Sequence, residues 1–580
     1  MISEAPAGVH ELLRLGKRKV ERPNSAARIA LLADTSSQIL AGALRGTAYN
    51  QSMNLEIFES EFDQIDMQVL SPNSALHKFA PETAILFQSC DRLAQKFSMM
   101  DADERVQLSE TFVSHVLRLH GRLRDAGYET ICVNLADPGD GIFGHFANKV
   151  RSSLTFQIRT INFELMRLAA DLDDFHICDL SHLQAEHGRD ALFDPKLYWS
   201  AKMSLTPEAC RLVAKELIQM ISVRKGGGYK CVILDLDNTI WGGVIGDDGL
   251  QHIQIGALGL GSAFSHFQGW LKQLKERGVV LAVCSKNDET VARSPFENHP
   301  EMVLRLDDIA VFVANWQDKA TNIRGIKDVI DIDYGAMVFL DDNPAERDLV
   351  RQSFPTMCVP EMSEDPCEYV NDLQRLNLFE TTSYTALDVH RTRAYQDELQ
   401  RRSEREHFVD ECEFLSSLKM RVSVNPFSPF NFPRIAQLTQ RSNQFNLRTI
   451  RYTEKQIAEL ADSSNHLTFC FELSDKFGDY GIVSLIVLER MPEGYFIDTW
   501  IMSCRVLGRG VERHALNTIS AAVQGAGAQW IIGEYVPTKR NEMVADHYET
   551  LGFSNLEQDV WQLDVTEFAT LPTQIIEDDQ

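Results

Sequence analysis

Three short apolar runs in the middle of the chain each end in a cluster of polar residues. The runs are Cys231–Leu236 (CVILDL, broken only by its aspartate), Val279–Cys284 (VVLAVC) and Met337–Leu340 (MVFL). Nearly continuous apolar runs of this length are typical of strands in a parallel sheet that is covered on both faces. Open α/β sheets bind ligands at the carboxyl ends of such strands. The pattern therefore predicts a parallel sheet with a ligand site at one edge.

The polar clusters contain four acids that would lie at this edge. Asp235 and Asp237 stand at the end of the first run, and Asp341 and Asp342 follow the third. Burying several carboxylates together is unfavourable without a cation. Oxygen ligands of this kind indicate a hard divalent ion such as Mg²⁺.

The order of these residues resembles the haloacid dehalogenase (HAD) superfamily of aspartate-dependent phosphotransferases. The strings LDLDNTIWGGVIGDDG, VCSKND, NWQDK and FLDDNPAER are similar to one subfamily, IIIC, the FkbH-like glyceryl transferase/phosphatases of polyketide pathways. The resemblance covers the middle region and continues into the C-terminal region. It implies a Rossmann-like HAD core.

The resemblance implies a role for each residue. Asp235 would be the nucleophile that forms an aspartyl phosphate, and Asp237 the general acid and base. Mg²⁺ would be held by Asp235, the carbonyl of Asp237 and Asp341, with help from Asp342. The phosphate would be bound by Thr239, Ser285 and Lys319. The alternative is a buried polar network without turnover.

The stretch between Thr239 and Ser285 is too short to hold a large cap domain together with the second strand. It is rich in glycine, which predicts a flap instead. The glycines are Gly242, Gly243, Gly246 and Gly249.

Cys284, next to Ser285, has two interpretations. As an unpaired cysteine it is expected to be a small buried hydrophobe. As a thiol near the phosphate site it could accept an acyl group from an acyl phosphate, although burial would raise its pKa and oppose this. We therefore keep Cys284 as a candidate catalytic residue.

The N-terminal region, residues 1–224, alternates candidate strands with helical patterns such as Phe112–Ala126, which predicts an α/β domain. The candidate strands are Ile29–Ala33, Asn54–Phe58, Thr83–Phe87 and Thr130–Val133. The region resembles SGNH-type hydrolase folds, with Ser36 or Ser37 near the usual nucleophile turn. The late stretch FDPKLYWSAKMSLT lacks the Asp-x-x-His pair, so a degenerate, non-catalytic domain is expected. The polar residues Asp34–Ser37 could instead cap the next helix.

Two joints divide the chain. Lys225–Gly228 (KGGG) precedes the first apolar run, and the highly charged segment 386–407 has the pattern of a solvated connecting helix. The predicted parts are 1–224, an HAD-like core at 229–385, the connecting helix, a C-terminal domain at 408–566 and an acidic tail at 567–580.

The C-terminal region is rich in strands and predicts an α+β domain. Leu467–Leu473, Gly481–Leu488 and Tyr495–Met502 precede the loop CRVLGRG and the helix Val511–Ala522. This arrangement resembles GNAT acyltransferases, whose loop binds a pyrophosphate at a helix N-terminus. The resemblance implies a cradle for coenzyme A or for the phosphopantetheine of a carrier protein, formed by Arg505, Gly508, Arg509, Gly510, Asn541 and Tyr548. A helix cap with solvated arginines is the alternative.

A further basic cluster lies in RSNQFNLRTIRYT and contains Arg441, Arg448 and Arg451. An acidic acyl carrier protein would need such a patch, because the overall charge of this chain would repel it. A solvated face is equally compatible with the pattern.

The overall charge limits the partners. The chain has 57 Lys and Arg against 83 Asp and Glu, a net charge of −26. This surplus argues against non-specific binding to nucleic acid or to anionic lipid. No apolar run is long enough to span a membrane, and the eleven cysteines include no CxxC pair. A cytoplasmic protein with reduced thiols is expected.

Three functions remain open. The first is Mg²⁺-dependent transfer of a glyceryl group from 1,3-bisphosphoglycerate, a phosphorylated three-carbon substrate, to an acyl carrier protein thiol with release of phosphate. The second is a small-molecule HAD phosphatase with a C-terminal domain that only binds. The third is an acyltransferase that uses acyl-CoA and carries a vestigial phosphatase.

Overall fold

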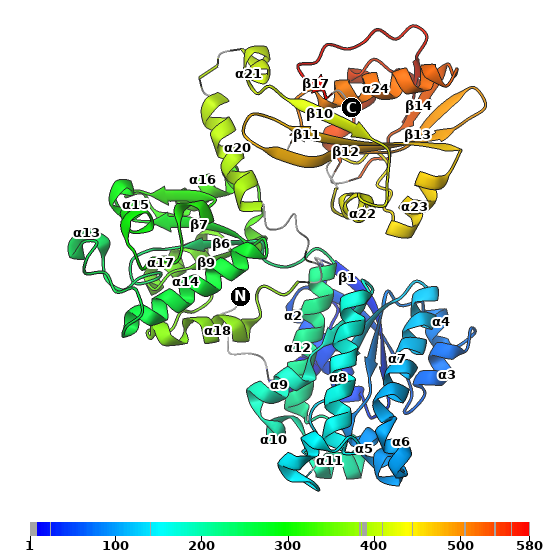
Figure 1. Ribbon diagram of the computed structural model, residues 1–580, viewed down its shortest axis with the longest axis vertical. Coiled ribbons are helices and arrows are strands. Elements are labelled where there is room, and N and C mark those ends of the chain that lie inside the picture. The colour runs from blue at the N-terminus through cyan, green and yellow to red at the C-terminus, as the bar shows by residue number, and fades with distance from the viewer. Residues whose placement is uncertain are drawn as a thin grey trace. The chain divides into compact units, whose positions relative to one another are not determined.

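The computed structural model describes residues 8–21, 23, 25–139, 141–381, 384, 391–405, 407–408, 410–442, 445–503, 506–538, 541–557 and 559–578 (Figure 1). The chain forms two compact units. The first comprises Met1–Leu306 and Phe312–Val389, and the second comprises Asp307–Val311 and His390–Gln580. No helix among the described residues is long and apolar enough to cross a bilayer.

The N-terminal domain is built on a five-stranded parallel sheet of order β2-β1-β3-β4-β5. Four of its strands coincide with the predicted apolar runs, and β5 was not predicted. The strands are β1 (Ser25–Ala33), β2 (Met53–Glu59), β3 (Thr83–Phe87), β4 (Glu129–Val133) and β5 (Phe175–Cys178).

Helices cover both faces of this sheet. Ile29 and Leu31 pack into one apolar core with α2 and α12, whereas Ala30 and Leu32 pack into the other with α7 and α8 (Figure 1). Successive side chains of a strand point to opposite faces, so an apolar run such as β1 is buried on both sides. The helices are α1 (Val9–Leu15), α2 (Gln38–Asn50), α3 (Ile65–Leu70), α4 (Ala75–Phe79), α5 (Cys90–Met99), α6 (Ala102–Val106), α7 (Leu108–Asp125), α8 (Leu154–Asp171), α9 (Leu180–His187), α10 (Arg189–Leu192), α11 (Pro195–Ala201) and α12 (Pro207–Arg224).

The middle domain contains a four-stranded sheet of order β8-β7-β6-β9, in which β6 pairs in parallel with both β7 and β9. The three predicted runs form the adjacent strands β7, β6 and β9, and the short edge strand β8 was not predicted. The strands are β6 (Cys231–Leu234), β7 (Val280–Ser285), β8 (Val311–Ala314) and β9 (Met337–Leu340). The helices are α13 (Ile245–Asp248), α14 (Leu260–Glu276), α15 (Glu289–Asn298), α16 (Lys319–Ile330), α17 (Pro344–Ser353) and α18 (Tyr369–Leu376).

The connection between β6 and α14 is small. It holds the four-residue helix α13 and an antiparallel bridge between Gly242 and Gln254. Gly243 has φ +94°, a left-handed conformation that glycine adopts without strain. The predicted glycine-rich flap therefore corresponds to one short helix and one tight turn.

The second unit contains an eight-stranded mixed sheet of order β15-β16-β14-β13-β12-β11-β10-β17, which confirms an α+β fold for this region. One face packs against α24 and the other against α22 and α23. The strands are β10 (Arg421–Asn425), β11 (His466–Ser474), β12 (Asp479–Arg490), β13 (Gly494–Met502), β14 (Trp530–Glu534), β15 (Ser554–Glu557), β16 (Val560–Asp564) and β17 (Ile576–Glu577). The helices are α20 (Arg391–Arg405), which lies within the predicted connecting segment, α21 (Glu411–Ser417), α22 (Phe432–Arg441), α23 (Glu454–Asp462), α24 (Val511–Gly525) and α25 (His547–Thr550).

Candidate active site

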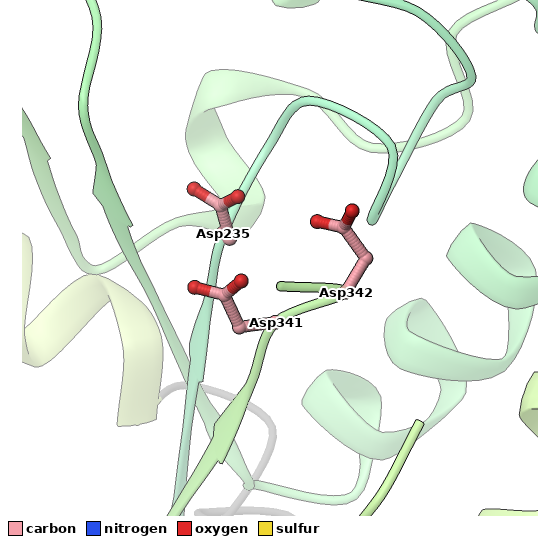
Figure 2. A group of neighbouring side chains, drawn as sticks. All are labelled: Asp235, Asp341 and Asp342. Carbon is pink, nitrogen blue, oxygen red and sulfur yellow. The ribbon is translucent and has the colours of Figure 1, made fainter. Parts of the chain in front are cut away.

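Three carboxylates meet at the carboxyl edge of the middle-domain sheet (Figure 2). Asp235 follows β6, and Asp341 and Asp342 follow the neighbouring strand β9. Each offers an oxygen, and these oxygens lie within 4.8 Å of one another. Asp341 is fully buried and Asp235 nearly so. Parallel pairing of β6 and β9 places the ends of both strands together, so residues more than a hundred positions apart form one group.

Lys319 supplies the cation of this group. It is the first residue of α16 and is almost completely buried. Its Nζ lies 2.8 Å from Asp235 Oδ1 and also donates to Asp341 Oδ2. Burial by itself would lower the pKa of Lys319, but attraction to Asp235 and Asp341 outweighs it and raises the pKa above its ordinary value. The ammonium group therefore stays charged.

One lysine does not balance three acids. Burial, together with repulsion from Asp235, raises the pKa of Asp341 to about 6. The same two causes raise the pKa of Asp342. Buried acids with raised pKa values bind a cation favourably, because the cation neutralises charge that the protein interior cannot solvate. The donor set of carboxylate oxygens fits a hard divalent ion such as Mg²⁺.

Two hydroxyl groups predicted to bind phosphate lie at the same edge. Thr239 is fully buried, and its Oγ1 donates to Asp342 Oδ1 at 3.2 Å and accepts from the Asp342 N–H at 3.1 Å. It thus fixes Asp342 in addition to any contact with a substrate. Ser285 is the last residue of β7, beside β6, and is also buried.

Asp237 lies outside the group of three carboxylates, because its carboxylate is held by other donors. Its Oδ1 accepts from Trp241 Nε1 at 2.9 Å and from the Ile245 N–H of the flap at 3.0 Å. Its Oδ2 accepts from Asn287 Nδ2 at 2.9 Å. Burial raises the pKa of Asp237 above its ordinary value, which suits an acid that must both give and take a proton.

Sequence reasoning did not find the residues that orient the acids. Trp241 and Asn287 fix Asp237, and Arg347 fixes the backbone of the other acidic pair. Arg347 Nη1 donates to the carbonyls of Asp341 at 2.8 Å and of Asp342 at 2.7 Å. Asn287 stands two residues after Ser285, and Arg347 is the last residue of the FLDDNPAER string. Their closeness to the motifs in the sequence is the signal that could have identified them.

Cys284 has the properties of a packing residue in this structure. Its side chain is fully buried, and its Sγ lies 3.9 Å from the Lys319 carbonyl. Burial raises the pKa of the thiol to about 12, so the reactive thiolate is scarce at neutral pH. These observations favour the first interpretation of Cys284, a small buried hydrophobe.

The N-terminal domain presents its polar turn Asp34–Ser37 after β1. The Ser36 hydroxyl donates to the Ala201 carbonyl at 2.7 Å, whereas a hydrolase serine needs a base as its partner. Asp34 accepts from the Ser89 N–H at 2.8 Å, and burial raises its pKa to about 7. Ser37 begins α2 as its N-terminal cap residue without a side-chain bond.

The residues of the loop expected to bind a pyrophosphate form hydrogen bonds with other residues of the chain. Arg505 lies outside the described residues. Gly508 and Gly510 have φ +73° and +83°, as tight glycine turns require. The Gly508 N–H donates to Glu512 Oε1 at 3.3 Å, so a carboxylate of α24 accepts a bond from this loop. Arg509 donates to Glu398 Oε2 at 2.9 Å and to the Tyr480 hydroxyl.

Asn541 and Tyr548, expected at the pantetheine end, are fully buried. The Asn541 amide donates to the carbonyls of Asn446 at 2.9 Å and Val536 at 3.0 Å. Neither side chain reaches the surface in this structure, and their contact with a pantetheine group stays a prediction. Asn541 holds a neighbouring segment in place.

That segment, 445–448, lies between two strands. β13 and β14 pair in parallel from Gly494 to Ile497, and beyond this point the segment pairs with both. The Met502 N–H donates to the Phe445 carbonyl at 3.2 Å, and the Val536 N–H donates to the Leu447 carbonyl at 2.8 Å. Backbone N–H groups at the point where β13 and β14 separate therefore have hydrogen-bond partners in segment 445–448.

The three arginines of the basic cluster predicted to bind a carrier protein differ in their surroundings. Arg448 pairs with Glu534 at 2.8 Å and with Asp498 at 2.9 Å, so its charge is already neutralised. Arg451 is exposed. The side chain of Arg441 lies outside the described residues.

The fold and the site together define a protein with an HAD-like phosphatase domain. Residues 28–222 match the model of the FkbH N-terminal domain. The N-terminal part of BF1531 from Bacteroides fragilis, which contains a phosphatase domain and was crystallised with Mg, is 43% identical, with a TM-score of 0.62. The match covers 65% of this chain and 100% of that chain. The chain belongs to the FkbH family.

Other similarities are weaker. The ribosomal-protein-S18-alanine N-acetyltransferase of Escherichia coli is 14% identical over 25% of this chain and 94% of that chain, with a TM-score of 0.20. A spermidine N-acetyltransferase of Vibrio cholerae, in complex with CoA and spermine, is 12% identical over 25% of this chain and 97% of that chain, with a TM-score of 0.20. No curated protein matches the chain.

Proposed function

We propose that this protein is a Mg²⁺-dependent HAD-type enzyme that loads a glyceryl group from 1,3-bisphosphoglycerate onto the thiol of an acyl carrier protein and releases phosphate. The observation that carries the proposal is the group of three carboxylates with one shared lysine at the strand ends. The relative with a phosphatase domain complexed with Mg supports it. Such a reaction belongs to polyketide-type biosynthesis.

The phosphatase step follows from the positions of the two acids. A carboxylate oxygen of Asp235 attacks the phosphorus, and the bond between phosphorus and the glyceryl oxygen breaks. Asp237 gives its proton to that oxygen. Asp237 then takes a proton from a water molecule that attacks the aspartyl phosphate, which restores Asp235 and releases inorganic phosphate.

The surrounding residues stabilise this step. Lys319 contacts the nucleophile, so its ammonium group lies where negative charge develops on the phosphoryl oxygens. Ser285 and Thr239 offer hydroxyl groups at the same edge. Asp235, Asp341 and Asp342 would hold Mg²⁺, which supplies positive charge for the phosphate oxygens.

The acyl step needs a thiol and no redox partner. A thiolate attacks the acyl carbon of the acyl phosphate, a C–S bond forms, and the C–O bond to phosphate breaks. The thiol proton goes to solvent, and the displaced phosphate leaves as the anion. The phosphopantetheine thiol of the carrier protein is sufficient for this step, since Cys284 is buried.

The direct test is the intact mass of a phosphopantetheinylated carrier protein after incubation with the enzyme, Mg²⁺ and 1,3-bisphosphoglycerate. We expect a mass increase of one glyceryl group together with released phosphate. The variant Asp235→Asn should leave the phosphate on the adduct, because it removes the nucleophile. Asp331→Asn is a matched control, since Asp331 is exposed at the C-terminal cap of α16. A working phosphatase without an acyl adduct on any carrier protein would refute acyl transfer.

A second candidate is a small-molecule phosphatase whose C-terminal domain only binds. The burial of Cys284 and the pairing of Arg509 and Arg448 favour it, because they leave the phosphatase site as the reactive centre. It predicts phosphate release from small esters at rates that a carrier protein does not change. Steady-state phosphate release with and without the carrier protein separates the two functions.

The third function, an acyl-CoA-dependent acyltransferase, receives less support. Its loop is bonded to Glu512 and its arginine to Glu398. It predicts that coenzyme A binds and that Gly508→Asp abolishes this binding, with no Mg²⁺-dependent turnover. Calorimetric titration of coenzyme A into both proteins is the test.

A further inference from the structure

An ion pair joins the segments that follow β7 and β9 at the carboxyl edge of the middle-domain sheet. Lys286 follows Ser285 at the end of β7, and Glu346 lies in the first turn of α17, which follows β9. Lys286 Nζ lies 2.6 Å from Glu346 Oε1. None of the motif roles described above uses either residue.

The strand order places this ion pair across the site. β6 lies between β7 and β9 in the sheet. A contact between the loop after β7 and the loop after β9 must therefore pass beside the end of β6, where Asp235 stands. Glu346 is also close enough to raise the pKa of Cys284, after the larger effect of burial, which places its charge near the same strand ends.

The two side chains of this ion pair differ in their exposure and in their hydrogen-bond partners. The Lys286 side chain is 39% exposed, whereas the Glu346 side chain is 16% exposed. Glu346 Oε2 is buried and accepts no hydrogen bond from any described residue. A buried carboxylate oxygen without a donor is unfavourable, so Glu346 keeps Lys286 as its partner, while the exposed part of the Lys286 side chain remains open to a further anion.

The other cations at these strand ends are committed to the protein. Lys319 is buried between Asp235 and Asp341, and Arg347 is buried against two backbone carbonyls. Among the described residues within two positions of the carboxyl ends of β6, β7 and β9, Lys286 is the one cation, and its side chain is 39% exposed. It stands one residue beyond Ser285, which is predicted to bind the phosphate.

We infer that Lys286 determines substrate specificity by binding a second anionic group of the substrate with its exposed side chain. The site would then prefer small phosphate esters that carry another phosphate or a carboxylate a few atoms from the reacting phosphorus. This inference rests on the proposed phosphatase reaction but not on acyl transfer. It names the substrate class of that reaction, since 1,3-bisphosphoglycerate has two anionic ends.

The test compares two three-carbon esters that differ in the second charge. 3-Phosphoglycerate carries a carboxylate where glycerol 3-phosphate carries a neutral hydroxymethyl group. We expect Lys286→Met to lower kcat/KM for 3-phosphoglycerate by about 10- to 100-fold, the range for a lost charge-assisted hydrogen bond, and the loss for glycerol 3-phosphate to be at least about fivefold smaller. 1,3-Bisphosphoglycerate, generated in situ, distinguishes a second phosphate from a carboxylate.

Three variants complete the comparison. Lys286→Arg should restore part of the preference, because it keeps the positive charge. Glu346→Gln should raise kcat/KM for 3-phosphoglycerate several-fold, because it removes the competing anion. Lys327→Met is the control for a general loss of charge, since Lys327 lies in the last turn of α16, at the opposite edge of the sheet.

Equal losses for both esters in Lys286→Met would overturn the inference, because a general electrostatic effect acts on any phosphate. If the enzyme hydrolyses neither ester, the same comparison is made by calorimetry with Asp235→Asn protein and Mg²⁺, where binding is measured without turnover. A carrier protein that is never loaded refutes acyl transfer only. The charge preference of Lys286 is tested separately, by the comparison of the two esters.

Discussion

The strand ends of the middle domain and the glycine loop of the C-terminal domain both gather charged residues, but they neutralise them differently. At the strand ends, three acids share one buried lysine. At the loop, Arg509 has Glu398 as its partner, and nearby Arg401 pairs with Asp475 through Nε–Oδ2 at 2.7 Å and Nη2–Oδ1 at 2.9 Å. The first region keeps an excess of negative charge, and the second region is balanced.

The difference separates a reactive site from a structural network. Excess buried charge is unfavourable in the folded protein alone, so its presence indicates a ligand of opposite charge. Paired and hydrogen-bonded charge needs no ligand. The pKa values follow this division: burial raises the pKa of Asp341, whereas hydrogen bonds and attraction from Arg401 overcome burial and lower the pKa of Asp475.

The largest expected effect is on catalysis at the unbalanced region. Asp341→Asn removes one metal ligand and one partner of Lys319, so we expect phosphatase activity to fall at least about 10³-fold. Mg²⁺ at a hundredfold excess over Kd should stabilise the wild-type protein by about 2.7 kcal/mol and the variant by far less. Thermal unfolding with EDTA and with Mg²⁺ measures this. Equal stabilisation of both proteins would show that the metal binds elsewhere.

The balanced region should respond in stability instead of activity. Asp475→Asn removes the bidentate partner of the buried Arg401 guanidinium and leaves only Glu398, at 3.6 Å, as a counter-charge, so we expect the free energy of unfolding to fall by about 3 kcal/mol. Phosphatase activity at a temperature where both proteins are folded should be retained. Urea unfolding with Asp479→Asn as the exposed control checks this prediction. If activity falls as far as in Asp341→Asn, the contrast between the two regions is wrong.

The two regions should respond to pH with opposite signs in metal-free protein. The folded pKa of Asp341, about 6, lies above its unfolded value, so local stability falls by about 2 kcal/mol as pH rises from about 4 to 6. The folded pKa of Asp475 is lowered, so the stability it contributes is present above its unfolded pKa of about 3.9 and is lost as pH falls further. Hydrogen-exchange protection of β9 and β12 between pH 3 and 7 measures both. A common sign in both strands would contradict the prediction.

The smallest effect is expected at Cys284. Cys284→Ala removes one buried sulfur, so we expect a loss of about 1 kcal/mol in the free energy of unfolding and a change of less than about twofold in phosphate release. Carrier-protein loading should change as little. A selective loss of loading, with phosphate release intact, would restore the interpretation of Cys284 as the acyl-accepting thiol.

Much of the middle domain could be predicted from the sequence. The apolar runs became β6, β7 and β9, because continuous apolar segments of this length are stable when covered on both faces. The strand β5 was not predicted because the histidine in Phe175–Cys178 interrupts its apolar pattern, and β8 (VFVA) was not predicted although it is as short and apolar as β9.

The sequence by itself determined which acids and which lysine lie together at the strand ends. Asp235, Asp341 and Asp342 directly follow apolar strands and Lys319 begins a helix, so local pattern placed them at one sheet edge. The tertiary structure alone decided which charges remain unbalanced. Arg509 meets Glu398, and Arg448 meets Glu534, across long separations in the chain. Whether a charge is free or paired depends on such distant partners, because Coulomb interactions act through space and not along the sequence.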